Sequence, residues 1–470
     1  MKFNSVINRI WKKFTITALL LLIAVVAFTT GNESRTALVY PPFKHTWGVV
    51  RATPAKLFML VGNRAKFAEP MGLACVRLES WVDPKVTGAD DEVVVYGINS
   101  NQNMVIYNKS MFELGIYGEH ETGSAQLNHP WGVAANGLGQ VYVTDTGNNR
   151  VVKMFNPKSE LRYVSSWGTQ GSDFGQFNQP RGIALDNYGK VYVADFLNNR
   201  IQIFDSGGKY LRSIFGLFGP AAVAAMDANE RWSYSYGPSR EEFLIVVDSL
   251  DSRVSKYSLD GKLLKRVLAS DWGVSSAQMQ FVAIDYFSQS LLTDRKNNCI
   301  WKLDRDLNLL CKFGQKGTAD YQFDDPRGIT LYRRFGQIFI AEHEGAQYYW
   351  VGVDLMNPQA NWDEKTRMMS ITGNLSETAF IDIDLLDASD KLVTRIGMTR
   401  GFAGPFKLVW DGTVRNFPKN GLTDAEQNQA SRYQVGNPVP PGEYKVKISS
   451  KATYSSIKDF EQVQTLPVTL

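Results

Sequence analysis

Arginine and tryptophan side chains recur at the middle of a short motif, Pro-x-Gly, and offer a way to bind an anion. The middle residues of the four copies before residue 330 are Met71, Trp131, Arg181 and Arg327. Arginine binds carboxylates through charge-assisted hydrogen bonds, and tryptophan stacks on planar groups and cations. These residues are therefore the candidate ligand-binding residues, for a ligand that is anionic or planar. In the alternative, both arginines pair with aspartates of nearby turns.

Motifs for catalysis are scarce in this chain. It has four histidines, His45, His120, His129 and His343, and none lies at HExxH or another metal-ligand spacing. It has no Gly-x-Ser-x-Gly elbow and no phosphate-binding loop. Hydrolase and nucleotide-binding functions therefore have no motif in their support.

The candidate residues belong to a repeat of 50 residues. Pro-x-Gly-Val/Ile-Ala, Val-Tyr-Val-x-Asp and Asn-Asn-Arg-Val/Ile occur in this order in residues 130–151 and again in residues 180–201. β-branched and aromatic runs separated by turn residues predict hairpins. A repeat of this length made of short strands is typical of a propeller blade. The glycine of each motif would let its strand run close to its neighbours near a crowded axis.

An aspartate at the end of one expected strand and an arginine five residues later recur in three units. We interpret these pairs as structural braces across the hairpin turn, with ligand contact as the alternative. The pairs are Asp145 with Arg150, Asp195 with Arg200, and Asp248 with Arg253.

The repeat extends more weakly over residues 36–356 and gives six units. The last unit has three strands, at residues 326–330, 337–342 and 347–353, and no convincing fourth. We expect residues 56–62 to form that strand and to pair beside residues 347–353, which closes the ring and removes exposed sheet edges. The expected fold class is all-β, with a six-bladed β-propeller first.

These motifs, with a closing Phe-Gly or Trp-Gly, resemble NHL repeats, closely in residues 129–216 and more loosely in residues 65–118, 219–268 and 277–355. The resemblance implies an NHL-type propeller with a ligand-facing end and no single activity. Such propellers include a zinc-dependent lyase, so His129 and His343 are lesser metal candidates, with ordinary loop histidines as the alternative. We expect no cofactor; calcium or zinc is the alternative.

Residues 357–470 follow a different pattern. Trp410-Asp411-Gly412 and Pro441-Gly442-Glu443-Tyr444, at this separation, resemble the immunoglobulin-like domain of the flagellar hook-capping protein. Short strands with turn signals every 8 to 12 or so residues also predict a β-sandwich. We expect Trp410 to lie in its core.

Residues 1–31 have the composition of a targeting segment. Four Lys or Arg residues and no acid accompany the uncharged apolar run from Phe14 to Phe28. This predicts a secretory signal peptide, with an uncleaved N-terminal membrane anchor as the alternative. Without this segment the formal charge of +4 becomes 4 − 4 = 0. A neutral protein has no overall attraction for nucleic acid, which we therefore do not expect as a partner.

The three cysteines, Cys75, Cys299 and Cys311, leave one thiol over in an exported chain. Cys299 and Cys311 flank a turn near Arg305, and we expect them opposite each other on adjacent strands. A disulfide between them is one interpretation, and two buried free thiols are the other.

Two inserts, residues 77–92 and 228–242, lengthen hairpins on the face opposite the candidate ligand-binding residues. The second contains Trp232, Tyr234 and Tyr236, which are candidate interface residues because exposed aromatic clusters usually contact something. Packing against the C-terminal sandwich is the alternative.

Together these observations predict an exported, non-enzymatic binding or scaffold protein at the cell envelope. Its expected partner is a protein, peptide or glycan at one propeller face, and a membrane contacts it only through an uncleaved N-terminal segment. The alternative is a metal-dependent lyase or hydrolase with its site at the channel mouth. Stoichiometric zinc or calcium in the purified protein would favour that alternative.

Overall fold

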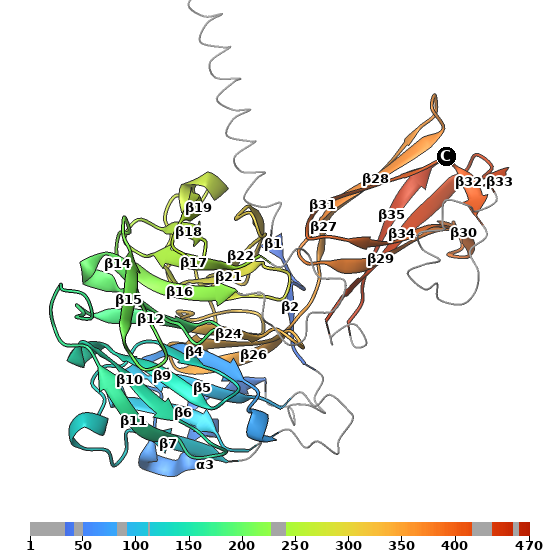
Figure 1. Ribbon diagram of the computed structural model, residues 1–470. Coiled ribbons are helices and arrows are strands. Elements are labelled where there is room, and N and C mark those ends of the chain that lie inside the picture. The colour runs from blue at the N-terminus through green and yellow to red at the C-terminus, as the bar shows by residue number, and fades with distance from the viewer. Residues whose placement is uncertain are drawn as a thin grey trace, which may run out of the picture.

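The computed structural model describes residues 33–41, 50–81, 92–110, 113–226, 241–415, 435–454 and 460–470. Within these residues, six sheets surround a common axis, and further strands project from one side of the ring (Figure 1). The described part of the chain contains no helix with the length and apolar character needed to cross a membrane.

Each of the first three blades is a four-stranded antiparallel sheet whose strands follow in chain order. Their strands are β4 (Pro70–Val76), β5 (Val94–Asn99), β6 (Met104–Asn108), β7 (Leu114–Tyr117), β8 (Val133–Ala135), β9 (Gln140–Asp145), β10 (Arg150–Phe155), β11 (Arg162–Trp167), β12 (Pro180–Leu185), β13 (Val191–Asp195), β14 (Arg200–Phe204) and β15 (Tyr210–Ile214).

Blades 4 and 5 repeat this arrangement, blade 6 has three strands in chain order, and short N-terminal strands join the outer edges of blades 5 and 6. Their strands are β16 (Pro220–Met226), β17 (Phe243–Asp248), β18 (Arg253–Tyr257), β19 (Leu263–Leu268), β20 (Met279–Ile284), β21 (Ser290–Asp294), β22 (Cys299–Leu303), β23 (Leu309–Phe313), β24 (Ile329–Tyr332), β25 (Gln337–Glu342), β26 (Gly345–Val351), β1 (Glu33–Ser34), β2 (Leu38–Val39) and β3 (Arg51–Ala52).

The second strand of most blades is buried on both faces because it is packed between neighbouring blades. All residues of β13, β17 and β21 are buried, whereas the outer strands β11 and β15 are partly exposed. The same sequence pattern thus gives both the hydrogen-bonded hairpins and the apolar contacts between blades.

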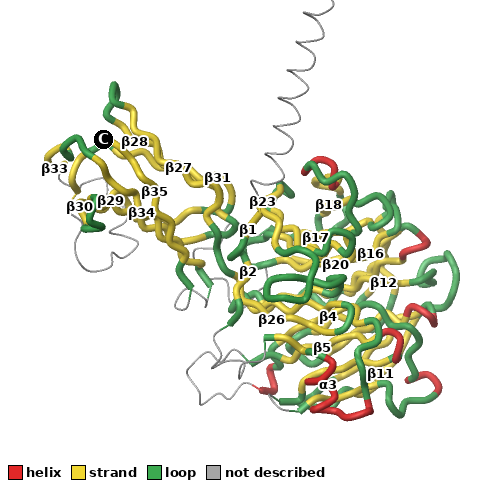
Figure 2. Tube along the Cα trace, turned by 180° about the vertical axis from the view of Figure 1, so that it is seen from behind, coloured by secondary structure: helices red, strands yellow, loops and turns green. Residues whose placement is uncertain are grey.

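The ring is closed, but not by the segment that the sequence predicts. Each inner strand contacts the next, and β24 of the last blade contacts β4 of the first. The fourth strand of the last blade comes from two short N-terminal pieces, β2 and β3, which both pair antiparallel with β26 (Figure 2). Tyr40 then stacks between Tyr321 and Tyr349, at centroid distances of 4.7 and 4.9 Å.

The predicted strand at residues 56–62 is wrong, because this segment forms the helix α3 (Pro54–Val61). Thr53 caps the helix by accepting a hydrogen bond from the Lys56 backbone N–H at 3.4 Å, and Pro54 occupies the first turn. Proline is favoured there because its missing N–H has no partner to lose. Phe58 lies on α3 and is 58% exposed, whereas a residue of a closing strand would be buried.

Seven short 3₁₀ turns complete the described part of the ring, several of them at the hairpin between the second and third strands. They are η1 (Gly62–Arg64), η2 (Glu79–Trp81), η3 (Ser100–Gln102), η4 (Gly123–Ala125), η5 (Thr146–Asn148), η6 (Phe196–Asn198) and η7 (Ala269–Trp272).

The strands after the ring form a three-stranded sheet, β27-β28-β31, and a four-stranded sheet, β30-β29-β34-β35, with a separate pair, β32-β33. One apolar cluster contains residues of both larger sheets and includes the fully buried Trp410. The strands are β27 (Leu355–Asp363), β28 (Met368–Leu375), β29 (Ala379–Asp387), β30 (Leu392–Gly401), β31 (Gly404–Trp410), β32 (Thr413–Arg415), β33 (Val435–Pro438), β34 (Glu443–Ala452) and β35 (Gln462–Thr469).

Polar contacts join these C-terminal sheets to blade 5. Glu377, between β28 and β29, receives a hydrogen bond from Lys302 Nζ at 2.6 Å and one from Gln289 Nε2 at 2.7 Å. Lys302 and Glu377 are both buried. The Tyr286 backbone N–H donates to the Tyr454 hydroxyl at 3.0 Å, which adds a further contact at the junction.

Candidate functional site

The first residues of the inner strands gather the motif residues at one end of the channel. In blades 3, 4 and 5 the first residue pairs with the aspartate that ends the second strand: Pro180 with Asp195, Pro220 with Asp248, and Met279 with Asp294. This register places Ala221 and Gln280 at the position of the four predicted residues. The sequence missed these two because their blades lack Pro-x-Gly; counting back from the turn aspartate would have found them.

Glycine in the motif permits close packing of neighbouring inner strands, as the sequence predicts. A Cβ on Gly132 would lie 2.5 Å from Arg181 O, and one on Gly182 would lie 2.5 Å from Ala222 Cα. A Cβ on Gly328 of the last blade would lie 2.0 Å from Met71 O of the first. Backbone-to-backbone approach of this kind leaves no room for a side chain.

Arg181 is a cation without an acidic partner among the described residues. Its guanidinium carbon lies 4.4 Å from the ring centre of Trp131 and 3.3 Å from that of Phe196. Its Nε is buried and has no hydrogen-bond acceptor among the described residues. Burial lowers the pKa of Arg181 to about 10, so the side chain still carries its charge at neutral pH. A partly buried arginine held only by aromatic faces can accept an anion without first breaking an ion pair.

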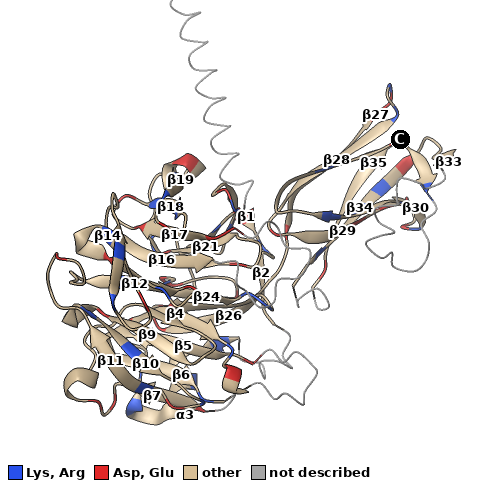
Figure 3. Ribbon diagram, viewed as in Figure 1, with Lys and Arg blue, Asp and Glu red and all other residues tan. Residues whose placement is uncertain are grey.

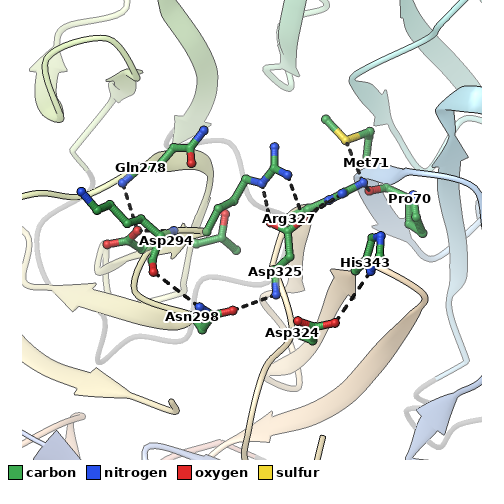
Figure 4. A network of polar contacts seen from close by, with 12 residues as sticks. Pro70, Met71, Gln278, Asp294, Asn298, Asp324, Asp325, Arg327 and His343 are labelled. Atoms are coloured by element: carbon green, nitrogen blue, oxygen red, sulfur yellow. Dashed lines mark hydrogen bonds and ion pairs between the residues drawn. The ribbon is translucent and has the colours of Figure 1, made fainter. Parts of the chain in front are cut away.

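Arg327 has the opposite surroundings, as Figure 4 shows. Its guanidinium binds Asp325 at 2.7 Å, and Asp325 also accepts a hydrogen bond from Arg295 at 2.8 Å. Arg327 is 5% exposed, and Met71 beside it is fully buried. For Arg327 the structure thus has the alternative, a pair with an aspartate, and the expectation that Met71 and Arg327 contact a ligand stays a prediction.

Trp131 contacts both Arg181 and a residue of blade 5. Its ring stacks on Phe281 of blade 5 at 6.4 Å, so residues from two blades meet across the axis. The indole Nε1 and Gln280 Oε1 are both buried without a hydrogen-bond partner among the described residues. Among the described residues, the mouth thus presents Arg181 without an acidic partner, the stacked rings of Trp131 and Phe281, and buried donor and acceptor atoms without hydrogen bonds.

Each of the two metal candidates has a polar neighbour. His129 Nδ1 lies 3.0 Å from Asn128 Oδ1, and His343 Nδ1 lies 3.7 Å from Asp324 Oδ2 (Figure 4). Within the described ranges, no three His, Cys, Asp or Glu side chains come together in a way that would hold a metal ion. Further ligands for either histidine would have to come from outside such a group of described side chains.

The Asp–Arg pairs lie across hairpin turns with close ion-pair geometry. The distances are 2.7 Å for Arg150–Asp145, 2.8 Å for Arg200–Asp195 and 2.7 Å for Arg253–Asp248. All three aspartates are fully buried, and Asp195 also accepts hydrogen bonds from the Asn178 backbone and Asn198. The geometry is that of the predicted braces across the turns.

The disulfide interpretation is wrong in this structure, where all three cysteines are free and buried. Cys311 is paired with Lys302 across the β22–β23 ladder, and Cys299 is paired with Asp294 on the other side of β22. The two thiols belong to different apolar clusters, one packed with blade 4 and one with blade 6. They therefore point to opposite faces of blade 5.

Other predicted features fall outside the described residues. These are the N-terminal segment 1–31 and the interface candidates Trp232, Tyr234 and Tyr236. In the view of Figure 3, Lys and Arg are interspersed with Asp and Glu over the propeller.

The NHL repeat model matches residues 127–154 and 177–204, which include the Asp–Arg turns of blades 2 and 3. The chain carries NHL repeats. The two matches contain the first three strands of their blades, β8 to β10 and β12 to β14, except for the last residue of β10. The Arg181 motif residue lies in the second of them.

Solved propeller structures show distant likeness to this NHL-repeat chain. A streptogramin B lyase is 12% identical with a TM-score of 0.43, over 61% of this chain and 94% of the lyase. A gluconolactonase from Xanthomonas campestris is 11% identical with a TM-score of 0.42, over 67% and 98%. The virginiamycin B lyase from Staphylococcus aureus is 14% identical with a TM-score of 0.39, over 57% and 83%. Such scores carry no argument about activity. Among curated proteins, none matches this sequence.

Proposed function

We propose that the protein is a non-enzymatic binding or scaffold module whose propeller holds an anionic ligand at the channel mouth. The observation that carries this proposal is Arg181, a partly buried guanidinium with two aromatic contacts and no acidic partner among the described residues. A carboxylate would supply the missing hydrogen-bond acceptors, and a planar group beside it would extend the stacking on Trp131.

The strength expected of such a contact is moderate. A hydrogen bond to a charged group contributes roughly 1.5–3 kcal/mol, and a desolvated cation–π contact contributes about 2 kcal/mol. Because the aromatic rings already hold the guanidinium, little side-chain entropy is lost when the anion binds. Selectivity for an acid over its neutral amide is therefore the feature to measure.

The test is to titrate the full chain with phenylacetate and, separately, with the neutral phenylacetamide. Tryptophan fluorescence monitors binding in both titrations. We expect the acid to bind at least about tenfold more tightly, since about 1.4 kcal/mol is a factor of ten. Arg181→Gln should remove that preference. The matched control is Arg162→Gln, because Arg162 is exposed and pairs with Glu160. Equal binding of acid and amide, or an unchanged preference in Arg181→Gln, would refute the proposal.

The alternative of a metal-dependent lyase or hydrolase has no observation of its own among the described residues. His129 and His343 would need further ligands close by, and the described side chains do not supply them. Stoichiometric zinc or calcium in the purified protein would nevertheless favour that alternative.

We also propose that the protein acts outside the cytoplasm, at the cell envelope, with a protein, peptide or glycan as partner. The support is the basic and apolar composition of residues 1–31. For residues 357–470 we propose an immunoglobulin-like domain, supported by the shared apolar cluster around Trp410. Fractionation of cells that express a C-terminally tagged chain tests the location, and recovery in the cytoplasm would contradict it.

A further inference from the structure

Large apolar side chains are exposed beside the channel mouth on blades 3 and 4. Leu197 is 46% exposed, Phe215 59%, Phe218 50% and Leu250 57%. We call these four residues the blade 3–4 surface. Single exposed apolar residues are ordinary, but a group of them on adjoining segments is a mark of contact with a partner.

The blade 3–4 surface is continuous with Arg181. Gly219 lies between its parts: a Cβ there would be 2.5 Å from Leu250 Cγ and 3.0 Å from Phe196 Cε2. Phe196 in turn stacks under the Arg181 guanidinium. The Ser249 backbone N–H also donates to Gly219 O at 3.0 Å, which ties the Leu250 turn to the link between blades. The unpaired cation therefore lies at one end of an apolar surface.

The propeller framework does not require these apolar side chains. Leu197 and Leu250 occupy the same place in their hairpin turns, two residues after the aspartate. The corresponding residues of blades 1, 2 and 5 are polar or glycine: Asn101, Gly147 and Lys296. Leucine at this exposed turn position is thus confined to two adjacent blades, next to Arg181.

Charge and shape favour one class of partner. The nearby acids Asp248 and Asp251 both pair with Arg253, so they leave the charge of Arg181 uncompensated. The segments that form the surface, residues 196–199, 215–219 and 249–252, contain no Lys or Arg, although Arg266 of β19 donates to Gly216 O at 3.3 Å. An anionic membrane would be held by several exposed basic side chains, whereas a recessed arginine beside an apolar surface suits a discrete chain.

We propose that the blade 3–4 surface docks an extended peptide segment that places a carboxylate on Arg181 and large apolar side chains on Leu197, Phe218 and Leu250. The inference rests on the proposed function, since it uses the same cation, and it adds the class of ligand. Side chains on both sides of an acidic residue would reach the mouth and the turns of two blades together.

The test is a selection from an equimolar library of N-acetylated, C-amidated heptapeptides, randomised at the three central positions, on the immobilised full chain. We expect at least about tenfold enrichment of peptides that combine Asp or Glu with Phe, Leu or Trp, relative to the same peptides with Gln. Leu197→Ser/Leu250→Ser should lose the apolar preference and keep phenylacetate binding. The matched control is Leu211→Ser/Leu263→Ser, which changes equally exposed leucines on outer strands (45% and 43%) and should behave as the wild type.

Each other outcome counts against the peptide. Phenylacetate binding without peptide enrichment would overturn this inference and leave the proposed function in place; absence of both would overturn both. Unchanged selection by Leu197→Ser/Leu250→Ser would show that the surface is not used. If the wild type co-sediments with vesicles of phosphatidylcholine and phosphatidylglycerol and Leu197→Ser/Leu250→Ser does not, the surface binds a bilayer and not a peptide. If the wild type forms a dimer in sedimentation velocity and that variant does not, the surface binds a second copy of the chain.

Discussion

Arg181 and Arg327 occupy the same motif position in blades 3 and 6, yet they have different roles. Asp325, two residues before Arg327, binds that arginine, whereas Arg181 is preceded by Gln179 and lies between two rings. The sequence predicts that both arginines reach the mouth. Which one is available depends on Phe196, whose position follows from the blade 3 turn, and on whether an acid precedes the motif.

The buried Asp–Arg pairs are expected to matter more than exposed ones. Asp195→Ala would leave the Arg200 guanidinium, 4% exposed, without its counter-charge. We expect a loss of about 3 kcal/mol in the free energy of unfolding, measured by urea denaturation. Glu160→Ala breaks an exposed pair with Arg162 and should cost less than about 0.5 kcal/mol. Similar losses in both variants would contradict this view of the turn.

The three thiols are expected to be unreactive in the folded chain. Burial raises the pKa of Cys75 and of Cys311 to about 12, and it raises that of Cys299 as well. Because the thiolate is the reactive form, iodoacetamide at about pH 8 should modify the native chain negligibly. After denaturation without reductant, mass spectrometry should find all three cysteines alkylated. If only Cys75 is alkylated, the result would instead support a disulfide between Cys299 and Cys311.

The strands that close the ring show where sequence patterns no longer predict secondary structure and strand pairing. Val-Tyr-Val runs and turn residues specify the strands of blades 2 and 3. The apolar run in residues 56–62 is too short to tell helix from strand by periodicity. Thr53-Pro54 was the available signal for a helix start. The pairing of β2 and β3 with β26 involves only two residues each, and no pattern of that length identifies a partner 300 residues away.

The closure predicts unequal effects for two aromatic residues of the N-terminal segment. Tyr40→Ala removes a ring stacked between two tyrosines and a hydroxyl that donates to Gln347 Oε1 at 3.1 Å. We expect a loss of about 3 kcal/mol in propeller stability, by thermal or urea unfolding. Phe58→Ala, on the exposed side of α3, should change stability by less than about 0.5 kcal/mol. A larger loss of stability in Phe58→Ala than in Tyr40→Ala would indicate that residues 56–62 close the ring.

At the scale of the whole molecule, a buried polar cluster joins blade 5 to the C-terminal sheets. Burial alone would lower the pKa of Lys302, but the carboxylates of Glu377 and Asp285 raise it above its usual value. Burial and the nearby Glu377 raise the pKa of Asp285 well above its usual value. The cluster thus holds more acid than its single lysine neutralises.

The excess acid predicts a pH-dependent gain from Asp285→Asn. The folded state holds a proton on Asp285 that the unfolded state releases above about pH 4. The stability of the protein therefore falls as the pH rises from about 4 towards the raised pKa of the folded state. The asparagine has no proton to lose, and its amide can donate towards Glu377. A tenfold change in protonation is worth about 1.4 kcal/mol, so we expect a gain of that order at pH 8 and little at pH 4. The free energy of unfolding of both proteins is measured by urea denaturation at pH 4 and pH 8. A gain that is largest at pH 4 would contradict a raised pKa of Asp285.

The N-terminal strand and the C-terminal sheets meet the ring at the same side. β1 runs parallel to β23 of blade 5, and the chain leaves the ring through β26 of blade 6 (Figures 1 and 2). A pulling force applied between the two ends of the protein would therefore enter and leave through adjoining blades. Blades 3 and 4, with Arg181 and the apolar surface, would bear none of that load, so a tethered molecule under tension would keep its mouth intact.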